Sequence, residues 1–213
     1  MKVSPVFYPG INCIDILPIS YAKHLDREIE LIFANSWNFR FDPNIAEFGH
    51  CFGVEETNLT VDQYTQLGFK REFFPVEDFT TFIRFLKESF KNQTPIGIFI
   101  DSFYCPWHVR FQIDHGSHYV LGFDINEQNE IICIDPGFNK QGVEKLPLEF
   151  LEKGYEYYFT LENVGCPNPS DLFKSYVESI DKLKSLNIPT KIEQFSRYFD
   201  EKFDYETECK DIL

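Results

Sequence analysis

An apolar segment followed by a hairpin constrains the fold of this chain more than any other part of its sequence. Residues 96–101 read Ile-Gly-Ile-Phe-Ile-Asp, a nearly continuous apolar run that predicts a buried β-strand. Two further apolar runs, at residues 118–123 and 131–135, enclose the polar segment 126–129 and predict a β-hairpin. Residues 155–160 are mostly aromatic and predict another strand. Hairpin strands pair antiparallel, so we expect an antiparallel sheet.

Helical patterns surround these strands. Apolar residues recur every third position in residues 13–25, which predicts a first helix, and Pro18 should make it short or kinked because proline lacks a backbone donor. Asp26 is expected to cap a second helix. The aromatic segment at residues 37–41, which comes after this helix, is expected to be extended. Pro75 is expected to open a strongly amphipathic helix. The sequence therefore predicts an α+β fold in which N-terminal helices pack on an antiparallel sheet.

The C-terminal part has a different character. Charged residues become more frequent, and the pair Asn168-Pro169 has the cap and proline that start a helix. Pro189 is expected to break this helix, and the segment from Thr190 to Glu193 fits a capping box for another. We therefore expect two parts: a main domain of residues 1–165 and a helical appendage, or the start of a second domain, at residues 166–213.

The charge balance excludes several classes of partner. With 34 acidic and 20 basic residues in a chain of 213, the formal net charge is −14. Nucleic acids and anionic membranes attract basic surfaces, so we expect neither as a partner, and a cationic or amine substrate fits better. The chain has no apolar run long enough to cross a membrane and no secretory signal, so we expect a cytoplasmic protein whose six cysteines are reduced thiols.

Three residues together suggest catalysis by a thiol nucleophile. Cys13 stands at the predicted start of the first helix, where free N–H groups and a partial positive charge favour thiolate over thiol. His118 opens one strand of the hairpin and Asp135 closes the other, so antiparallel pairing places them side by side. The imidazole can then donate to the carboxylate and offer its other nitrogen to the thiol. Taken singly, each residue also fits a structural role in a core or at a strand end.

A metal site is the competing interpretation. Cys105-x-x-His108 and His115-x-x-His118 supply four possible ligands within 14 residues. Their spacing is not a familiar zinc pattern, and apolar residues between the two pairs favour packing instead. Phosphate-binding loops, dinucleotide fingerprints and the serine-hydrolase motif are missing from the sequence, so nucleotide and serine-hydrolase functions have no support.

Residues 98–138 resemble the N-terminal domain of the butirosin-biosynthesis protein H family. The shared features are a strand aspartate, aromatic residues with a proline, a histidine that opens an apolar strand ending in Gly-x-Asp, and an Asp-Pro pair. In this sequence they are Asp101, Tyr104, Pro106, His118, Gly122, Asp124, Asp135 and Pro136. The segment Gly10-Ile11-Asn12-Cys13 and the helix after it also fit, so the resemblance extends over about residues 5–160.

This resemblance implies a papain-like cysteine-peptidase fold and an acyltransferase, or a related thioester or amide hydrolase, in antibiotic and other secondary metabolism. If the roles of the family's residues are carried over to this chain, Cys13 is the nucleophile, His118 is the base and Asp135 is the acid that orients the histidine. The acyl group comes from the phosphopantetheine thioester of an acyl or peptidyl carrier protein and passes to a small amine acceptor. We expect no metal and no cofactor on the chain itself, because phosphopantetheine arrives on the carrier.

The oxyanion hole departs from the papain-like pattern. Such enzymes usually carry a glutamine shortly before the cysteine, and this chain has Phe7 and Tyr8 in that region. The oxyanion would therefore need the backbone N–H of Cys13 and a second donor from a neighbouring side chain. The residues expected in the oxyanion hole or along the cleft are Tyr8, Asn12, Asp101 and Tyr104.

Two further functions stay open. The chain can be a non-catalytic binding module of the same fold that docks on a biosynthetic synthetase. It can also be a metal-binding protein that uses the cluster between Cys105 and His118. The reactivity of the Cys13 thiol distinguishes the binding module from the enzyme. Metal analysis of the purified protein distinguishes the metal-binding protein from both.

Overall fold

The structure is a computed structural model, and it divides the chain into two compact units. One unit comprises residues 1–29 and 58–167, and the other comprises residues 30–57 and 168–213. Residues 30–57 thus group with the C-terminal helices rather than with their neighbours in sequence. The division into domains 1–165 and 166–213 stays a prediction about independent folding. The structure describes residues 3–8, 11–29, 39–44, 52–54, 59, 61–138, 142–165 and 168–202.

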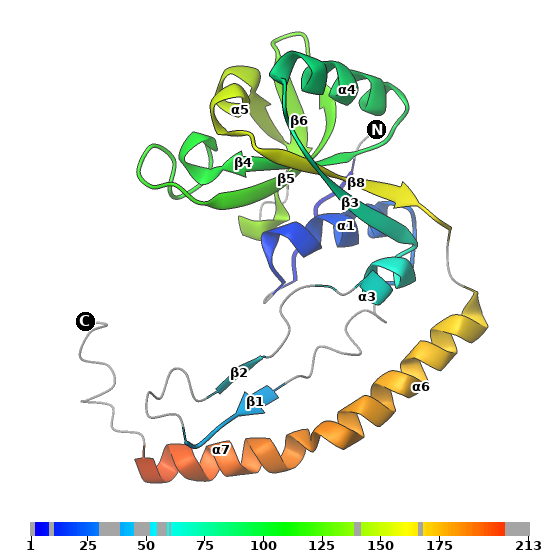
Figure 1. Cartoon of the computed structure of the whole chain (residues 1–213), viewed down its shortest axis with the longest axis vertical. Coiled ribbons are helices and arrows are strands. Elements are labelled where there is room, and N and C mark those ends of the chain that lie inside the picture. The colour runs from blue at the N-terminus through cyan, green and yellow to red at the C-terminus, as the bar shows by residue number, and fades with distance from the viewer. Residues whose placement is uncertain are drawn as a thin grey trace. The chain divides into compact units, whose positions relative to one another are not determined.

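The larger unit is built on a six-stranded antiparallel sheet, and the fold is mixed α+β, as the sequence predicted (Figure 1). The strand order is β3-β8-β4-β5-β6-β7, so the predicted hairpin β5–β6 lies inside the sheet. The strands are β3 (Phe69–Pro75), β4 (Ile96–Asp101), β5 (Ser117–Ile125), β6 (Glu130–Ile134), β7 (Glu144–Pro147) and β8 (Tyr157–Asn163).

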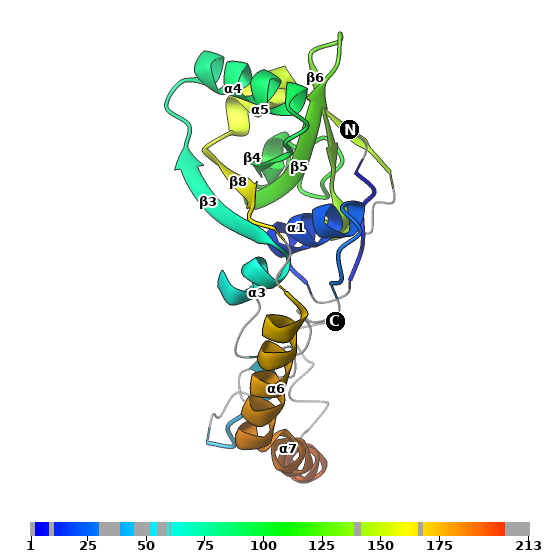
Figure 2. The ribbon, with the colours of Figure 1, turned by 90° about the vertical axis from the view of Figure 1, so that its right-hand side faces the viewer.

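Helices cover both faces of this sheet. The views in Figures 1 and 2 place α4 (Phe79–Lys91) and α5 (Leu148–Gly154) on one face and α1 (Cys13–His24) on the other. Every residue of β4 from Ile96 to Ile100 is buried, as expected for a central strand with both faces covered. The apolar run that first indicated a strand is therefore explained by two cores, one on each side of β4.

The first helix forms where the sequence predicted it, and it continues past Pro18 to His24. Asn12 caps it by accepting a hydrogen bond from the backbone N–H of Asp15 at 2.8 Å. The helix packs against β5 with Ile16, Leu17 and Ile19, whose side chains are fully buried. The predicted helix after Asp26 does not begin at residues 27–29, and the rest of that segment lies outside the described residues.

Two helix starts differ from the sequence prediction. Pro75 is the last residue of β3 and not the first of a helix; α4 begins at Phe79 after its cap Asp78. Pro75 is tolerated because β3 is an edge strand, where one side of the backbone needs no partner strand. Thr190 lies inside α7 (Ile188–Lys202) rather than at a capping box. The chain turns instead at Asn187, which has a left-handed φ of 50°.

The smaller unit contains a two-stranded antiparallel sheet of β1 (Phe39–Phe41) and β2 (Phe52–Val54), with α6 (Pro169–Leu186) and α7. Phe41 meets Phe195 and Tyr198 of α7 edge to face. One short helix, α3 (Val61–Gln66), completes the described helices of the larger unit. Within the described part of the chain, no helix has the length and apolar character needed to cross a lipid bilayer.

Candidate active site

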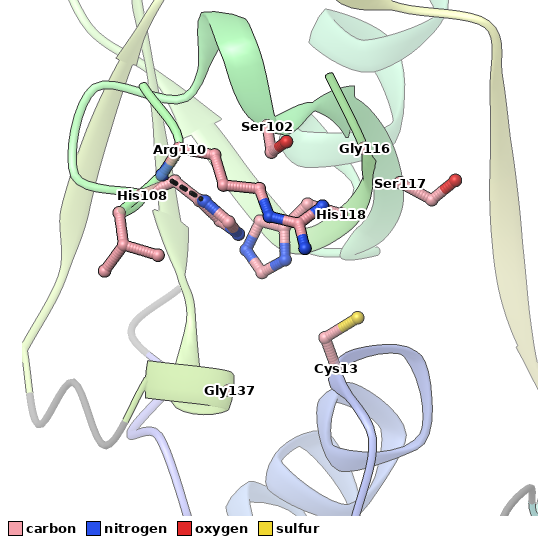
Figure 3. A pocket seen from close by; sticks show the side chains of 9 residues that line it. Cys13, Ser102, His108, Arg110, Gly116, Ser117, His118 and Gly137 are labelled. Carbon is pink, nitrogen blue, oxygen red and sulfur yellow. Dashed lines mark hydrogen bonds between the residues drawn. The ribbon is translucent and has the colours of Figure 1, made fainter. Parts of the chain in front are cut away.

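A cavity of about 380 Å³ opens in the larger unit between the start of α1 and the beginning of β5 (Figure 3). Three parts of the chain form its walls: the first turn of α1, the loop before β5, and the 3-10 turn η3 (Pro136–Phe138). The residues that line it are Cys13, Ser102, His108, Val109, Arg110, Gly116, Ser117, His118 and Gly137.

Cys13 is the first residue of α1, and its side chain is partly exposed to the cavity. The first N–H groups of a helix have no partner within the helix, and the helix dipole places a partial positive charge there. Gly137 leaves room for the thiol, because a Cβ at that position would lie only 3.3 Å from the Cys13 Cβ. The three described cysteines, which also include Cys105 and Cys133, are free thiols.

His118 connects Cys13 to Asp135. Its Nε2 lies 2.7 Å from Oδ2 of Asp135, and both side chains are buried. The Cys13 side chain lies on the other side of the ring, close enough to raise the pKa of His118. Because Nε2 faces Asp135, Nδ1 is the ring nitrogen that faces the thiol, and Figure 3 shows Cys13 on the wall opposite the ring. The structure thus brings together the three residues that the sequence placed in one cleft.

The ionisation of His118 follows from its two acidic neighbours. Burial lowers the pKa of an imidazole, but the hydrogen bonds and negative charges of Asp135 and Cys13 outweigh burial and raise the pKa of His118 to about 9. The ring is therefore protonated at neutral pH. An imidazolium between a carboxylate and a thiol is the arrangement that stabilises a thiolate nucleophile.

Asp135 has a second partner that the sequence did not reveal. Its Oδ2 accepts a hydrogen bond from Nε1 of Trp107 at 2.6 Å, in addition to the bond with His118. Within the described residues, Oδ1 has no hydrogen-bond partner. The indole fixes the carboxylate, which in turn fixes the orientation of the His118 ring. An indole N–H needs a polar partner, but nothing in the sequence pattern identifies Asp135 as that partner.

The four expected oxyanion or cleft residues do not line the cavity. The amide of Asn12 is bonded to the backbone and carboxylate of Asp15, and the carbonyl of Tyr8 accepts from Ile11. Oδ1 of Asp101 accepts from two backbone N–H groups, while Oδ2 lies 2.6 Å from Nδ1 of His115. The ring of Tyr104 packs edge to face against Phe103.

His108, which the sequence offered only as a possible metal ligand, and Arg110, which it did not indicate, also line the cavity. The ring of His108 meets that of His118 edge to face at 4.9 Å between centroids. Burial and the neighbouring His118 charge lower the pKa of His108, so this second ring is neutral. Its Nδ1 accepts the backbone N–H of Arg110 at 3.0 Å. The loop before β5 follows successive turns rather than a helical or strand period, so no sequence pattern indicates its path.

The structure brings together a different set of possible metal ligands from the set that the sequence suggested. In the described part of the chain, the ligand atoms of Cys105, His118 and Asp135 lie within 4.8 Å of one another, and all three side chains are buried. Nδ1 of His108 is bonded to the Arg110 backbone, and Nδ1 of His115 to Asp101. Burial, followed by the Asp135 charge, raises the pKa of Cys105 to about 12, so this thiol is protonated at neutral pH.

The raised pKa of His118 predicts how stability depends on pH. Because the folded-state pKa of about 9 lies above the ordinary 6.5, the pairing stabilises the fold fully below about pH 6.5, and this contribution disappears as pH rises through about 9. We expect the free energy of unfolding of the wild type, measured with urea, to fall between pH 6 and pH 10. This fall should exceed that of His118→Gln by on the order of 2 kcal/mol. Parallel curves for the two proteins would contradict an imidazolium at this site.

No protein-family model matches this sequence, and no curated protein matches it either.

Proposed function

We propose that the chain is a cysteine-dependent acyltransferase, or a related thioester or amide hydrolase, with a papain-like fold. The observation that carries this proposal is that Cys13 and His118 line the same cavity, while Nε2 of His118 is bonded to Asp135 at 2.7 Å. Helix α1 contributes the thiol, β5 contributes the histidine, and the residue directly after β6 contributes the carboxylate that orients it. The resemblance to the butirosin-biosynthesis protein H family supports an acyl donor carried as a phosphopantetheine thioester.

In the first half-reaction, the Cys13 thiolate attacks the carbonyl carbon of the donor thioester and forms a new C–S bond. The carbonyl oxygen takes negative charge, which the backbone N–H of Cys13 and the helix dipole stabilise. The bond to the phosphopantetheine sulfur then breaks. The His118 imidazolium gives its proton to the leaving thiolate, so the carrier departs as a neutral thiol and an acyl-enzyme remains.

In the second half-reaction, an amine acceptor, or water in a hydrolase, attacks the acyl carbon. Neutral His118 takes the proton that the attacking group loses. The C–S bond to Cys13 breaks, and the thiolate–imidazolium pair forms again. The carboxylate of Asp135 stays ionised throughout and holds the ring in place. A cytoplasmic location, which keeps Cys13 reduced, is part of this proposal.

The decisive experiment is to detect the acyl-enzyme. We expect the wild-type chain, incubated with an S-acyl-N-acetylcysteamine thioester, to gain the mass of one acyl group, and peptide mapping to place that group on Cys13. The same thiol should react with iodoacetamide near pH 6–7 faster than Cys105 or Cys133, because those two thiols are buried. Cys13→Ala is the control. Alkylation of Cys13 no faster than of Cys105, together with no adduct, would leave the binding module as the better function.

A metal site is the second candidate, because Cys105, His118 and Asp135 converge. A metal ion would have to replace the direct 2.7 Å contact between His118 and Asp135 and to deprotonate Cys105. Stoichiometric zinc that stays bound through purification, and is lost in Cys105→Ala but kept in Cys13→Ala, would favour this function. The direct contact favours the acyltransferase.

A further inference from the structure

The cavity has a different charge from the rest of the chain. The whole sequence carries 34 acidic and 20 basic residues. Among the described residues that line the cavity, none is an aspartate or a glutamate, and the charge of His118 is paired with Asp135 at 2.7 Å. Arg110 is therefore the lining residue whose positive charge is available to a ligand. The local chemistry therefore favours an anionic group next to Cys13.

The guanidinium of Arg110 lies along the cavity wall. The backbone N–H of Arg110 donates to Nδ1 of His108, which fixes the start of the side chain. At the other end, a Cβ at position 116 would lie 2.8 Å from Nη1 of Arg110, so Gly116 leaves room for the guanidinium. Figure 3 shows the side chain extending from the loop towards Gly116 at the beginning of β5.

The ion pair that Arg110 makes within the protein is weak. Asp114 lies 3.7 Å away, and both side chains are more than half exposed, so solvent screens their attraction. A guanidinium has five N–H donors arranged to bind a carboxylate or a phosphate with two parallel bonds. One contact of 3.7 Å with Asp114 leaves donors that an incoming anion can use.

The size of the cavity limits what can bind. At roughly 30 Å³ for each water-sized group, about 380 Å³ holds on the order of a dozen non-hydrogen atoms. This is enough for a thioester with a short acyl chain, or for the end of a phosphopantetheine arm, and too small for a folded partner. Ser102 and Ser117, which also line the cavity, add neutral hydrogen-bonding groups.

We propose that Arg110 binds an anionic group of the acyl donor, either a carboxylate on the acyl chain or the phosphate of the phosphopantetheine arm. This inference rests on the proposed acyltransferase, and it makes the donor rather than the amine acceptor the ligand of this cavity. Arg110 is a specificity-determining residue here, since the attack itself needs only Cys13 and the residues that activate it. The anion is fixed at one end, so that the thioester carbonyl lies at Cys13.

Binding to Cys13→Ala tests this proposal without chemistry. Two pairs of probes differ only in an anion: 4′-phosphopantetheine against pantetheine, and S-glutaryl- against S-pentanoyl-N-acetylcysteamine. We expect the anionic member of one pair to bind about tenfold more tightly, because a charge-assisted hydrogen bond replaces a neutral contact. The pair that shows the preference identifies the source of the anion. Adding Arg110→Gln should abolish the preference, whereas Arg84→Gln, which changes an exposed arginine on α4, should leave it intact.

Equal affinities within both pairs would overturn the proposal, and so would a preference that survives Arg110→Gln. Its failure is distinguishable from that of the acyltransferase. If Cys13→Ala prefers the anionic probes but the wild type forms no acyl-enzyme, the chain is an anion-binding module and not an acyltransferase. If the acyl-enzyme forms equally well from neutral and anionic donors, the acyltransferase proposal stands and the proposed role of Arg110 is wrong.

Discussion

Replacing His118 with glutamine is expected to slow acylation of Cys13 by roughly 100- to 10,000-fold, the range for loss of a general acid–base group. In the proposed mechanism the imidazolium stabilises the attacking thiolate and protonates the departing thiolate, and glutamine does neither. Glutamine can still donate a hydrogen bond to Asp135, so the buried carboxylate keeps a partner. The rate is measured as the growth of the acyl adduct of S-pentanoyl-N-acetylcysteamine by intact-protein mass spectrometry.

His115 supplies a matched control for this experiment. Like His118, it is paired with an aspartate: its Nδ1 lies 2.6 Å from Asp101. Unlike His118, it is exposed and does not line the cavity. His115→Gln should therefore acylate at the wild-type rate. Equal losses in the two variants would show that the effect comes from disturbing a His–Asp pair near β5 and not from catalysis.

The hairpin of β5, which carries His118, and β6, which Asp135 directly follows, was the most predictable part of the molecule. Apolar runs separated by a short polar turn identify a hairpin, and antiparallel pairing then brings the two ends together. The approach of Cys13 depends instead on how α1 packs against β5 and η3. No local pattern encodes that packing, and only the helix-start position of Cys13 and the order Cys, His, Asp suggested the connection.

The elements that the sequence did not predict share a physical reason. Strand β3 reads Phe-Lys-Arg-Glu-Phe-Phe-Pro, and most of its residues are exposed because it lies at the edge of the sheet. An edge strand lacks the continuous apolar run that identified β4. Trp107, His108 and Arg110 belong to a loop of successive turns, where hydrogen bonds between specific backbone groups determine the path. Such bonds leave no periodicity in the sequence.

A buried carboxylate, two residues after Cys13, holds the start of α1. Asp15 is fully buried, and its oxygens accept from Nδ2 of Asn12 at 2.9 Å and from the hydroxyl of Tyr64 at 2.6 Å. They also accept from the backbone N–H of Leu59 at 2.8 Å and form an ion pair with Arg71 at 3.3 Å. Arg71 in turn donates to the Tyr64 hydroxyl and lies over its ring. One carboxylate thus connects the first turn of α1 to α3 and β3.

Replacing Asp15 with alanine is expected to cost about 3–5 kcal/mol of stability, because it leaves the largely buried Arg71 charge and several donors without their acceptor. Asp15→Asn keeps the shape of the side chain and some of the hydrogen bonds, so its loss should be smaller. Asp78→Ala, which removes an exposed carboxylate at the start of α4, is the matched control and should cost less than either. Urea unfolding measures all three.

If Asp15→Ala cost no more than Asp78→Ala, the network would not be what holds α1 in place. If it does cost more, the folded fraction of Asp15→Asn should also react more slowly with iodoacetamide at Cys13, because the helix start that positions the thiol next to His118 has loosened.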